Sequence, residues 1–570
     1  MKTKALFLLL VLLLSSGCST RVEPADLVLT NGRVVTMDPD LPDAEAIAIV
    51  GSRIAAVGTI GEIEPFIGEK TRTVDLEGRL AIPGLIEGHG HFLGLGQSKL
   101  ILDLTKAMSW EDIVEMVQEA VAQRSPGEWI LGRGWHQEKW NSVPEKSVKG
   151  LPLHDELSAV SPTNPVLLEH ASGHAVLANA KAMELAGVTS ATRAPEGGAI
   201  VRDGEGRPIG VFRETAAGLI DEAFQESRSE LSEADLRKDR LQMIDLATKE
   251  CLKNGITSFQ DTGASFVEVD VYRELAESGS LGVRLYVMLG ASNEELASRA
   301  DDYRMIGHGD GFLTVRSIKC FSDGALGSHG AWLLKPYDDL PESSGLNTTS
   351  IESLRETARI AAEKDLQLCI HAIGDRANRE VLDIYEEYLS QLAPGEDRRW
   401  RIEHAQHLDP EDVPRFAELG VIAAMQGVHA TSDGPWIPQR LGEERSRKGS
   451  YVWRDLLDSG AVIVNGTDAP VENVNPIASF YASVSRRMKD GNTFYPEQAM
   501  TREEALRSYT LDAAYGAFEE EQKGSLKPGK LADITVLSKD ILTMPEEEIP
   551  GTQVVYTIVD GKVVYERGGD

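Results

Sequence analysis

The sequence has 570 residues, of which 42% are hydrophobic and 26% are charged, a composition typical of a soluble globular protein. This composition excludes a fibrous repeat and long-range disorder. Lys and Arg number 58 against 90 Asp and Glu, so the formal net charge is −32. A chain this acidic is repelled by phosphate backbones, and nucleic-acid binding is not expected. The four cysteines are too few for a disulfide framework and form no CxxC pair.

The start of the chain predicts export. Two lysines precede an unbroken apolar run over residues 5–14, which suits the core of a signal peptide and is too short to span a bilayer. The run leads into Leu14-Ser-Ser-Gly-Cys18, which resembles the lipobox of bacterial lipoproteins, where the cysteine is lipidated. We therefore expect residues 1–17 to be a lipoprotein signal peptide. A lipid on Cys18 would then anchor the protein in the bacterial cell envelope, facing the periplasm or the exterior. An ordinary secretory signal with an incidental cysteine is the alternative.

The body of the chain repeats one order of elements: an amphipathic helix, a glycine and a β-branched run. A helical pattern over 241–251 stops at Asn254-Gly255, and Ile256–Asp261 then has the composition of a strand. Strands that alternate with helices pair in parallel, and eight units favour a (β/α)8 barrel, here over residues 80–523, with an open doubly wound sheet as the rival. The eight strand candidates are Leu80–Ile86, Ile256–Asp261, Val283–Leu289, Leu313–Lys319, Leu366–His371, Arg401–His404, Val421–Met425 and Ala461–Asn465.

Two regions fall outside this pattern. The segment 92–255 is too long for a βα loop and must carry its own structure. Because βα loops open on the catalytic face of such barrels, we expect this insertion to build a wall or lid over the site. Residues 18–79 and 524–570 alternate apolar and polar side chains around turns. We expect these two ends of the chain to pair in one small composite β-sandwich domain.

Residue types that bind metals recur where the predicted strands end. His89 and His91 follow the first strand, and residues i and i+2 of an extended chain project to the same side, so both imidazoles can reach one ion. An HxH pair alone is a weak signal, because one histidine is ordinarily a satisfied core or loop residue. Polar side chains that end several strands are harder to explain in that way, since all strand ends of a barrel meet at one mouth. The further strand-end residues are Lys319, His371, His404 and Asp468.

These segments resemble the amidohydrolase superfamily. The resemblance rests on Pro83-Gly-Leu-Ile-Glu-Gly-His-Gly-His91, on the two strand-end histidines and on Gly466-Thr-Asp468. The segment Lys319-Cys-Phe-Ser-Asp-Gly-Ala-Leu-Gly-Ser328, together with Gly134-Trp135, is similar to the amidohydrolase-3 (YtcJ-like) branch, which includes N-substituted formamide deformylases. With the C-terminal run 524–534, the resemblance covers essentially all of residues 25–567.

The resemblance implies a divalent-metal site, with zinc as the expected ion. It implies that Asp468 is both a ligand and the proton shuttle. It also implies that Lys319 is the fourth-strand lysine, which is carboxylated in many relatives and bridges two metals. A Lys319 that stays an amine, paired with Asp323 or another acid, is the alternative and favours one ion. The implied ligands are His89, His91, His371, His404 and Asp468, with Lys319 as a sixth when it is carboxylated.

The insertion supplies candidates for substrate binding. His174 resembles a family position that faces the substrate, and Trp135 and His136 are candidates to line an apolar pocket. Packing within the insertion explains these aromatic residues equally well. His170 and His174 are four residues apart, so a separate metal pair on a helix is a further alternative.

Two functions from different classes remain open. The first is a metal-dependent hydrolase of a non-peptide C–N bond in a small amide, in which Asp468 moves the proton. The second is a catalytically silent lipoprotein that binds a small molecule on the same barrel. The full set of donors favours the enzyme, because a silent binding protein has no physical need for it. The sequence indicates neither the substrate nor the oligomeric state.

Overall fold

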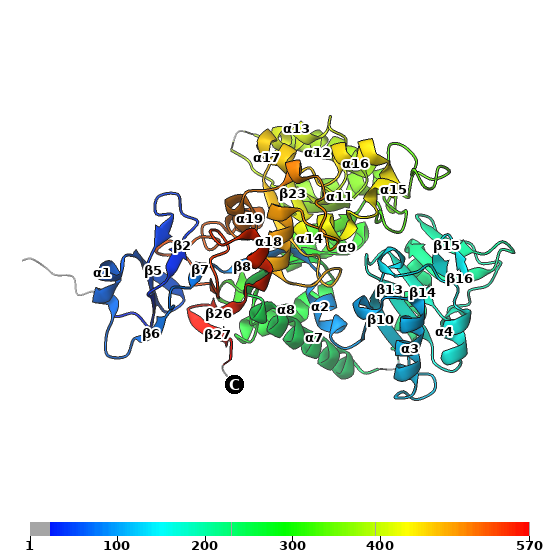
Figure 1. The fold of residues 1–570 in the computed structure, drawn as a ribbon, viewed down its shortest axis with the longest axis horizontal. Helices are drawn as coiled ribbons and strands as arrows, with labels where there is room; N and C mark the ends of the chain where they lie inside the picture. The colour runs from blue at the N-terminus through cyan, green and yellow to red at the C-terminus, as the bar shows by residue number, and fades with distance from the viewer. Residues whose placement is uncertain (1–22, 230, 394, 569–570) are drawn as a thin grey trace, which may run out of the picture.

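The computed structural model describes residues 23–229, 231–393 and 395–568. The predicted signal segment and Cys18 lie outside these residues. Within these ranges, no helix combines the length and apolar character needed to cross a membrane. Figure 1 shows a β-rich region, a central barrel with its helices and a second mixed region arranged along the long axis of the molecule.

The centre of the molecule is a parallel eight-stranded barrel. Its neighbouring strands pair in parallel along the whole sheet. The sheet closes where the backbone N–H of Asp468 donates to the carbonyl of His89 at 2.8 Å. The predicted (β/α)8 fold is confirmed and the open sheet is excluded. In sheet order the strands are β8 (Leu85–Gly90), β17 (Ile256–Ala264), β18 (Arg284–Leu289), β20 (Leu313–Phe321), β21 (Gln367–Ala372), β22 (Arg401–His404), β23 (Ile422–Gln426) and β24 (Ile463–Gly466).

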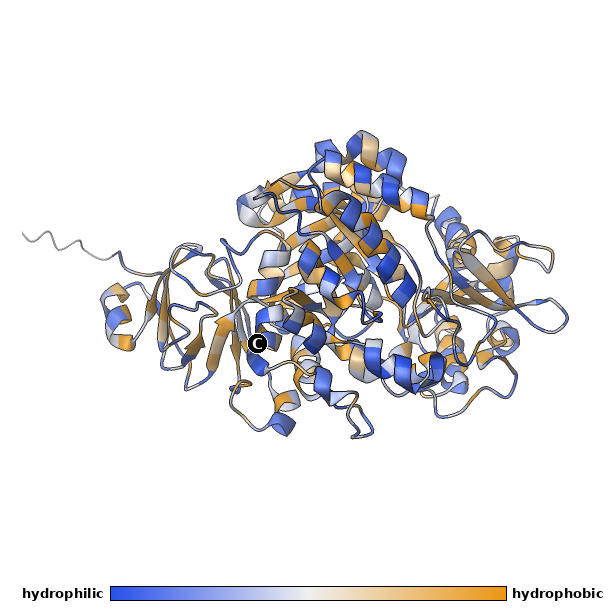
Figure 2. Cartoon of the chain, turned by 90° about the horizontal axis from the view of Figure 1, so that it is seen from above, coloured by the Kyte–Doolittle hydropathy of each residue, from blue (hydrophilic) through white to orange (hydrophobic). Residues whose placement is uncertain are grey.

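Amphipathic helices surround the barrel. In Figure 2 the outer helices carry both hydrophobic and hydrophilic residues, while the strands are largely hydrophobic. At Gly255 the chain has a φ of 77°, which suits glycine and lets it turn from a helix into β17. The main helices are α2 (Phe92–Ser98), α7 (Glu233–Lys253), α8 (Phe266–Glu277), α9 (Asn293–Tyr303), α11 (Ile351–Glu363), α12 (Asp375–Leu389), α13 (Val413–Leu419), α14 (Gly427–Asp433), α15 (Ile437–Leu441), α16 (Glu443–Gly449), α17 (Trp453–Ser459), α18 (Pro476–Ser485), α19 (Arg502–Ser508) and α20 (Leu511–Gly516).

The predicted first strand, Leu80–Ile86, is divided between two sheets. Its first half, β7 (Leu80–Pro83), pairs antiparallel with β25 (Ile534–Leu537) outside the barrel. Pro83 lacks an N–H for a continuing ladder. At Gly84 an added Cβ would lie 2.2 Å from the hydroxyl of Thr257, so the chain crosses from one sheet to the other at a close contact. The barrel therefore begins at Leu85 and not at residue 80.

Both ends of the chain contribute to the β-rich region. A six-stranded sheet has the order β27-β26-β25-β7-β2-β3, and a four-stranded sheet has the order β5-β4-β1-β6. Leu29, Ile47 and Ile534 share one buried core between them. The remaining strands of this region are β1 (Leu27–Thr30), β2 (Arg33–Val35), β3 (Asp43–Ala44), β4 (Ala46–Val50), β5 (Arg53–Gly58), β6 (Arg72–Asp75), β26 (Val554–Val559) and β27 (Lys562–Glu566).

The insertion has a six-stranded sheet of its own, in the order β15-β16-β14-β13-β10-β9. It is narrower than the predicted range 92–255, because α2 and α7 pack on each other and cover the barrel. Figure 1 shows this region beside the barrel mouth, linked through α7. Its elements are β9 (Leu102–Asp103), α3 (Trp110–Val121), β10 (Ile130–Trp135), α4 (Asp155–Val160), β13 (Val166–His170), β14 (Ala175–Ala178), α5 (Ala180–Leu185), β15 (Gly198–Arg202), β16 (Pro208–Glu214) and α6 (Gly218–Ser227).

Candidate active site

The six predicted metal-site residues come together at the carboxyl ends of the barrel strands. They line one cavity, called here the ligand cavity, together with His174 from the insertion. Nε2 of His91 lies 3.2 Å from Oδ1 of Asp468, and Nε2 of His89 lies 3.5 Å from the same oxygen. These three residues each offer one ligand atom within 4.8 Å of the others. The cluster arises because β8 and the residues after β24 are neighbours at the point where the barrel closes.

The other histidines face the same group. The ring of His404 lies 4.7 Å from that of His89 and 4.4 Å from that of His371, measured between centroids. Burial lowers the pKa of both His371 and His404 well below the usual histidine value. Both imidazoles are therefore neutral at physiological pH, which is the form that binds a metal ion.

Three buried atoms of this cluster make no well-aligned hydrogen bond among the described residues: Nε2 of His89, Nε2 of His371 and Oδ1 of Asp468. Leaving such an atom unpaired costs about 1–3 kcal/mol each. Imidazole nitrogen and carboxylate oxygen are donors that Zn²⁺ takes in proteins. The residues present therefore fit a divalent ion held between them.

Lys319 extends into the same cavity from β20. Its Nζ lies 3.9 Å from the ring centroid of Phe321, and burial lowers the pKa of this amine. The ion pair with Asp323 considered for a free amine is not formed. The carboxylate of Asp323 instead accepts backbone N–H bonds of 2.8–3.0 Å from residues 332, 373 and 374. These bonds hold the loops after β20 and β21.

Polar side chains behind the histidines fix their orientation. Nδ1 of His89 hydrogen-bonds to Glu403, and the guanidinium of Arg401 donates to the same carboxylate at 2.7 and 2.9 Å. Nδ1 of His404 pairs with Oε1 of Gln426 at 2.8 Å. Each contact directs the other ring nitrogen towards the cluster. Asp468 and His404 have φ values of 57° and 74°, and backbone strain of this kind is concentrated at functional sites.

His174 reaches the ligand cavity from the insertion. Its Nδ1 lies 2.7 Å from Oε2 of Glu214, and its ring lies 4.9 Å from that of His371. Burial lowers the pKa of His174, but the Glu214 carboxylate outweighs it and the pKa is raised above its usual value. Glu214 was not predicted from the sequence, because its partner lies 40 residues away. The one sequence feature that could have indicated a role for Glu214 is its position at the end of β16.

The structure corrects one predicted role in the insertion, that of Trp135, and excludes one alternative, the His170–His174 metal pair. Trp135 does not line either the ligand cavity or its neighbour described below. Its indole is buried in the insertion core, where Nε1 donates to the carbonyl of Leu168 at 2.9 Å. His170 and His174 do not form a metal pair on a helix, because β13 ends at His170 and a turn follows. Nδ1 of His170 already pairs with Ser172 and Nε2 with Gln137, at 2.8 and 3.2 Å.

Residues 72–565 match the Amidohydrolase family. The chain belongs to this family. The chain is 34% identical to Protein LONG AFTER FAR-RED 3 of Arabidopsis thaliana, over 95% of this chain and 92% of that protein. It is 28% identical to an N-substituted formamide deformylase of Arthrobacter pascens, over 95% of this chain and 99% of that enzyme. A crystal structure of an uncharacterized metal-dependent hydrolase from Pyrococcus horikoshii superposes with a TM-score of 0.72 at 26% identity, over 91% of this chain and 99% of that one.

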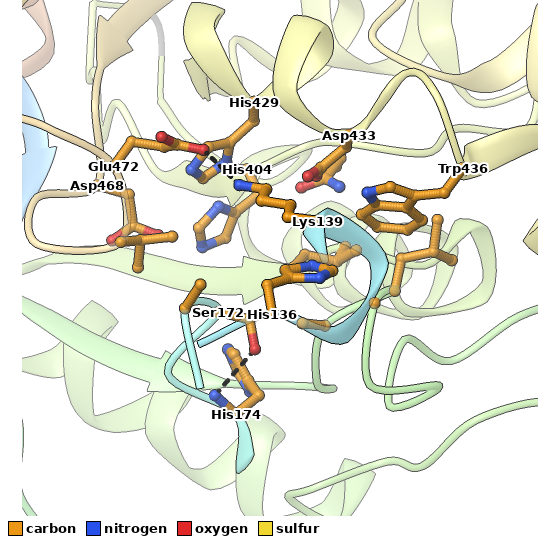
Figure 3. Close-up of a pocket in the computed structure, with 17 residues that line it drawn as sticks. His136, Lys139, Ser172, His174, His404, His429, Asp433, Trp436, Asp468 and Glu472 are labelled. Carbon is orange, nitrogen blue, oxygen red and sulfur yellow. Dashed lines mark hydrogen bonds and ion pairs between the residues drawn. The ribbon is translucent and has the colours of Figure 1, made fainter. Parts of the chain in front are cut away.

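This amidohydrolase-family protein has a second cavity, called here the side cavity, which adjoins the metal-ligand cluster. His174, His404 and Asp468 line both cavities. Figure 3 shows polar side chains from the insertion and from the barrel loops facing each other across it. Those that the ligand cavity does not share include His136, Lys139, His429, Asp433, Trp436 and Glu472.

Proposed function

We propose that this protein hydrolyses a non-peptide C–N bond, of the amide type, in a small molecule. The observation that carries the proposal is the group of ligand atoms on His89, His91 and Asp468, which lie within 4.8 Å of one another beside an open cavity. Membership in the Amidohydrolase family supports a metal-dependent hydrolase in general. The formamide deformylase among its relatives supports an N-substituted amide as substrate.

A divalent ion bound by the cluster would lower the pKa of a water bound to it to about 7, and it would polarise a carbonyl group. The chain's own residues supply the proton transfers. Asp468 accepts the proton of the water that adds to the carbonyl carbon, and it passes this proton to the amide nitrogen as the C–N bond breaks. The products are then a carboxylic acid and an amine. The ion would be held by His89, His91, His371, His404 and Asp468, with zinc as the expected metal.

His174 has a position suited to the substrate carbonyl. Glu214 holds its Nδ1, which leaves Nε2 as the nitrogen free to meet a ligand. Because its pKa is raised, the imidazole carries more positive charge near neutral pH than an unperturbed histidine. It would donate a hydrogen bond to the carbonyl oxygen as negative charge develops there.

Lys319 decides how many ions the site holds. A buried amine of lowered pKa is partly neutral, and a neutral amine adds carbon dioxide to give an anionic carbamate ligand. We propose this carboxylated form with two ions. Plain lysine in the active protein, measured by intact mass, would favour one ion. The lipid anchor on Cys18 and the envelope location stay predictions from the sequence.

The proposed function is tested by an activity screen of the metal-loaded protein on formamides, acyl amides and cyclic amides. Asp468→Asn keeps the shape of the side chain and a carbonyl oxygen but cannot take a proton. We expect kcat to fall about 10²–10⁴-fold with at least part of the metal content retained. Asp458→Asn, on the exposed face of α17, is the matched control and should leave kcat unchanged. A fully metallated Asp468→Asn protein with normal kcat would show another proton route. Ligand binding without turnover of any amide would favour the silent binding protein.

A further inference from the structure

The side cavity opens beside Asp468, so it can receive the non-reacting end of a substrate whose amide reaches that residue. Asp468 and His404 line this cavity, and the rest of its wall comes from the insertion, from α14 and from loops that follow barrel strands. Figure 3 shows Lys139, Asp433, Trp436 and Glu472 along this wall, away from His174. The non-reacting end of the substrate therefore meets a wall that carries charge.

The charges of this wall do not cancel. Nζ of Lys139 lies 3.3 Å from Oε1 of Glu472, so these two groups form an ion pair. Asp433 has neutral partners: the Tyr451 hydroxyl donates to Oδ2 at 3.0 Å, and the Ser432 hydroxyl donates to Oδ1 at 3.4 Å. Within the described ranges no cationic nitrogen lies within 4.0 Å of the Asp433 oxygens. With Asp433 ionised, one negative charge is left over at this wall.

Two further atoms indicate that the wall is built to meet a ligand. Nε1 of Trp436 and Nε2 of His429 have no hydrogen-bond partner among the described residues. The two side chains are only 5% and 7% exposed, and both line the side cavity. An indole N–H can only donate and an ammonium group cannot accept, so a water must supply the acceptor for Trp436, whereas Nε2 of His429 can accept a hydrogen bond from an ammonium group. Burial also raises the pKa of Asp433, although Lys139 and His429 oppose this, and a bound cation would favour the ionised form.

We propose that the side cavity binds a positively charged amine at the non-reacting end of the substrate, and that Asp433 is the residue that selects it. A single positive charge would neutralise the excess negative charge of the wall. An anionic end is disfavoured because Lys139 is already paired and two carboxylates lie beside it. This inference rests on the proposed function only for the choice of which end reaches Asp468.

The test uses three formamides with the same four-carbon chain and different far ends. N-(4-aminobutyl)formamide ends in an ammonium group, N-pentylformamide in a methyl group and 5-formamidopentanoate in a carboxylate. Their affinities are measured by calorimetry on the metal-loaded Asp468→Asn protein, in which turnover is slowed. We expect the ammonium compound to bind about 10–100-fold more tightly than the methyl compound, the range for a hydrogen bond to a charged group.

The same measurements with Asp433→Asn added should abolish this preference, whereas Asp458→Asn added in its place should retain it. Equal affinities, tightest binding of the carboxylate compound, no binding of any compound, or a preference that survives Asp433→Asn would each overturn the inference. The comparison of the three ligands with Asp433 in place decides the matter even if Asp433→Asn does not fold. If the expected binding order holds but the unmutated protein hydrolyses none of the three, nor any amide in the screen, the proposed function fails and the cation site stands.

Discussion

At the scale of single residues, Glu403 shows how the barrel interior prepares a metal ligand. Burial raises the pKa of Glu403, but Arg401 and His89 lower it further, to about 2, so the carboxylate stays ionised inside the barrel. An ionised partner on Nδ1 fixes the tautomer of His89 and makes its other nitrogen a better donor. Arg401 also donates to the carbonyl of Gly88 at 2.8 Å, which ties the network to β8.

We therefore predict that Glu403→Gln weakens metal binding about 10–100-fold, the usual effect of losing such a partner. Affinity is measured by competition with a chelator, and the absorption spectrum of the cobalt-loaded protein reports a change in ligand geometry. Glu387→Gln, on the outer face of α12, is the control and should bind metal as the parent does. Parent affinity and an unchanged cobalt spectrum in Glu403→Gln would show that the carboxylate serves only the packing of Arg401.

The predicted ligand residues were accessible from the sequence because each lies at or just after the end of a predicted strand, where the barrel rule places all such ends at one mouth, and the family resemblance implies their role as ligands. Glu214, Glu403 and Asp433 were not accessible in this way. Their roles depend on contacts made across the fold, such as the 2.7 Å contact between Glu214 and His174. The prediction for Trp135 was wrong for a related reason. An aromatic residue at the end of a strand can point into the core or into a cavity, and the direction of its side chain depends on how the strand pairs in the sheet.

At the scale of elements, the helix after the HxH motif, α2, approaches the backbone of α7 very closely at one residue. At Gly96 in α2 an added Cβ would lie 1.9 Å from the carbonyl oxygen of Met243 in α7. The backbone of α7 cannot yield without moving away from the barrel. The need for a glycine at position 96 could not be predicted from the sequence, because Gly96 and Met243 are far apart in the chain. The division of Leu80–Ile86 between two sheets could not be predicted either. Two consecutive apolar strands have the same sequence pattern as one longer strand, and only long-range pairing shows that they belong to different sheets.

We predict that Gly96→Ala lowers the free energy of unfolding by about 1–3 kcal/mol, the range for overpacking a core. Because α2 begins directly after His91, metal content should fall as well. Gly218→Ala is the matched control, since it lies in α6 with no atom within 4 Å of the added carbon. This control should be neutral or stabilising by up to about 1 kcal/mol. Urea unfolding followed by circular dichroism gives both values, and equal stability of the two variants would mean that α2 can shift without cost.

At the scale of the whole molecule, a buried ion pair joins the barrel to the β-rich region formed by both chain ends. Arg284 in β18 donates to Asp533 at 2.7 and 3.2 Å, and to Asp560 at 3.3 Å. The Arg284 and Asp533 side chains are only 1% and 3% exposed. Asp533 lies beside β25, so this contact spans 249 residues of sequence. Charge of this kind cannot be left unpaired in a protein interior without a large penalty.

We predict that Asp533→Asn destabilises the protein by about 3–5 kcal/mol, because it leaves Arg284 buried with a weaker partner. The control is Asp245→Asn, which breaks an exposed pair with Lys249 on α7 and should cost less than about 1 kcal/mol. Because the ion pair connects the barrel to the β-rich region, its loss should also make the two regions unfold at different temperatures. Calorimetry should then show one transition for the parent and two for Asp533→Asn, with the β-rich region melting first. A variant that melts once, at the temperature of the control, would show that the shared apolar contacts hold the regions together without the ion pair.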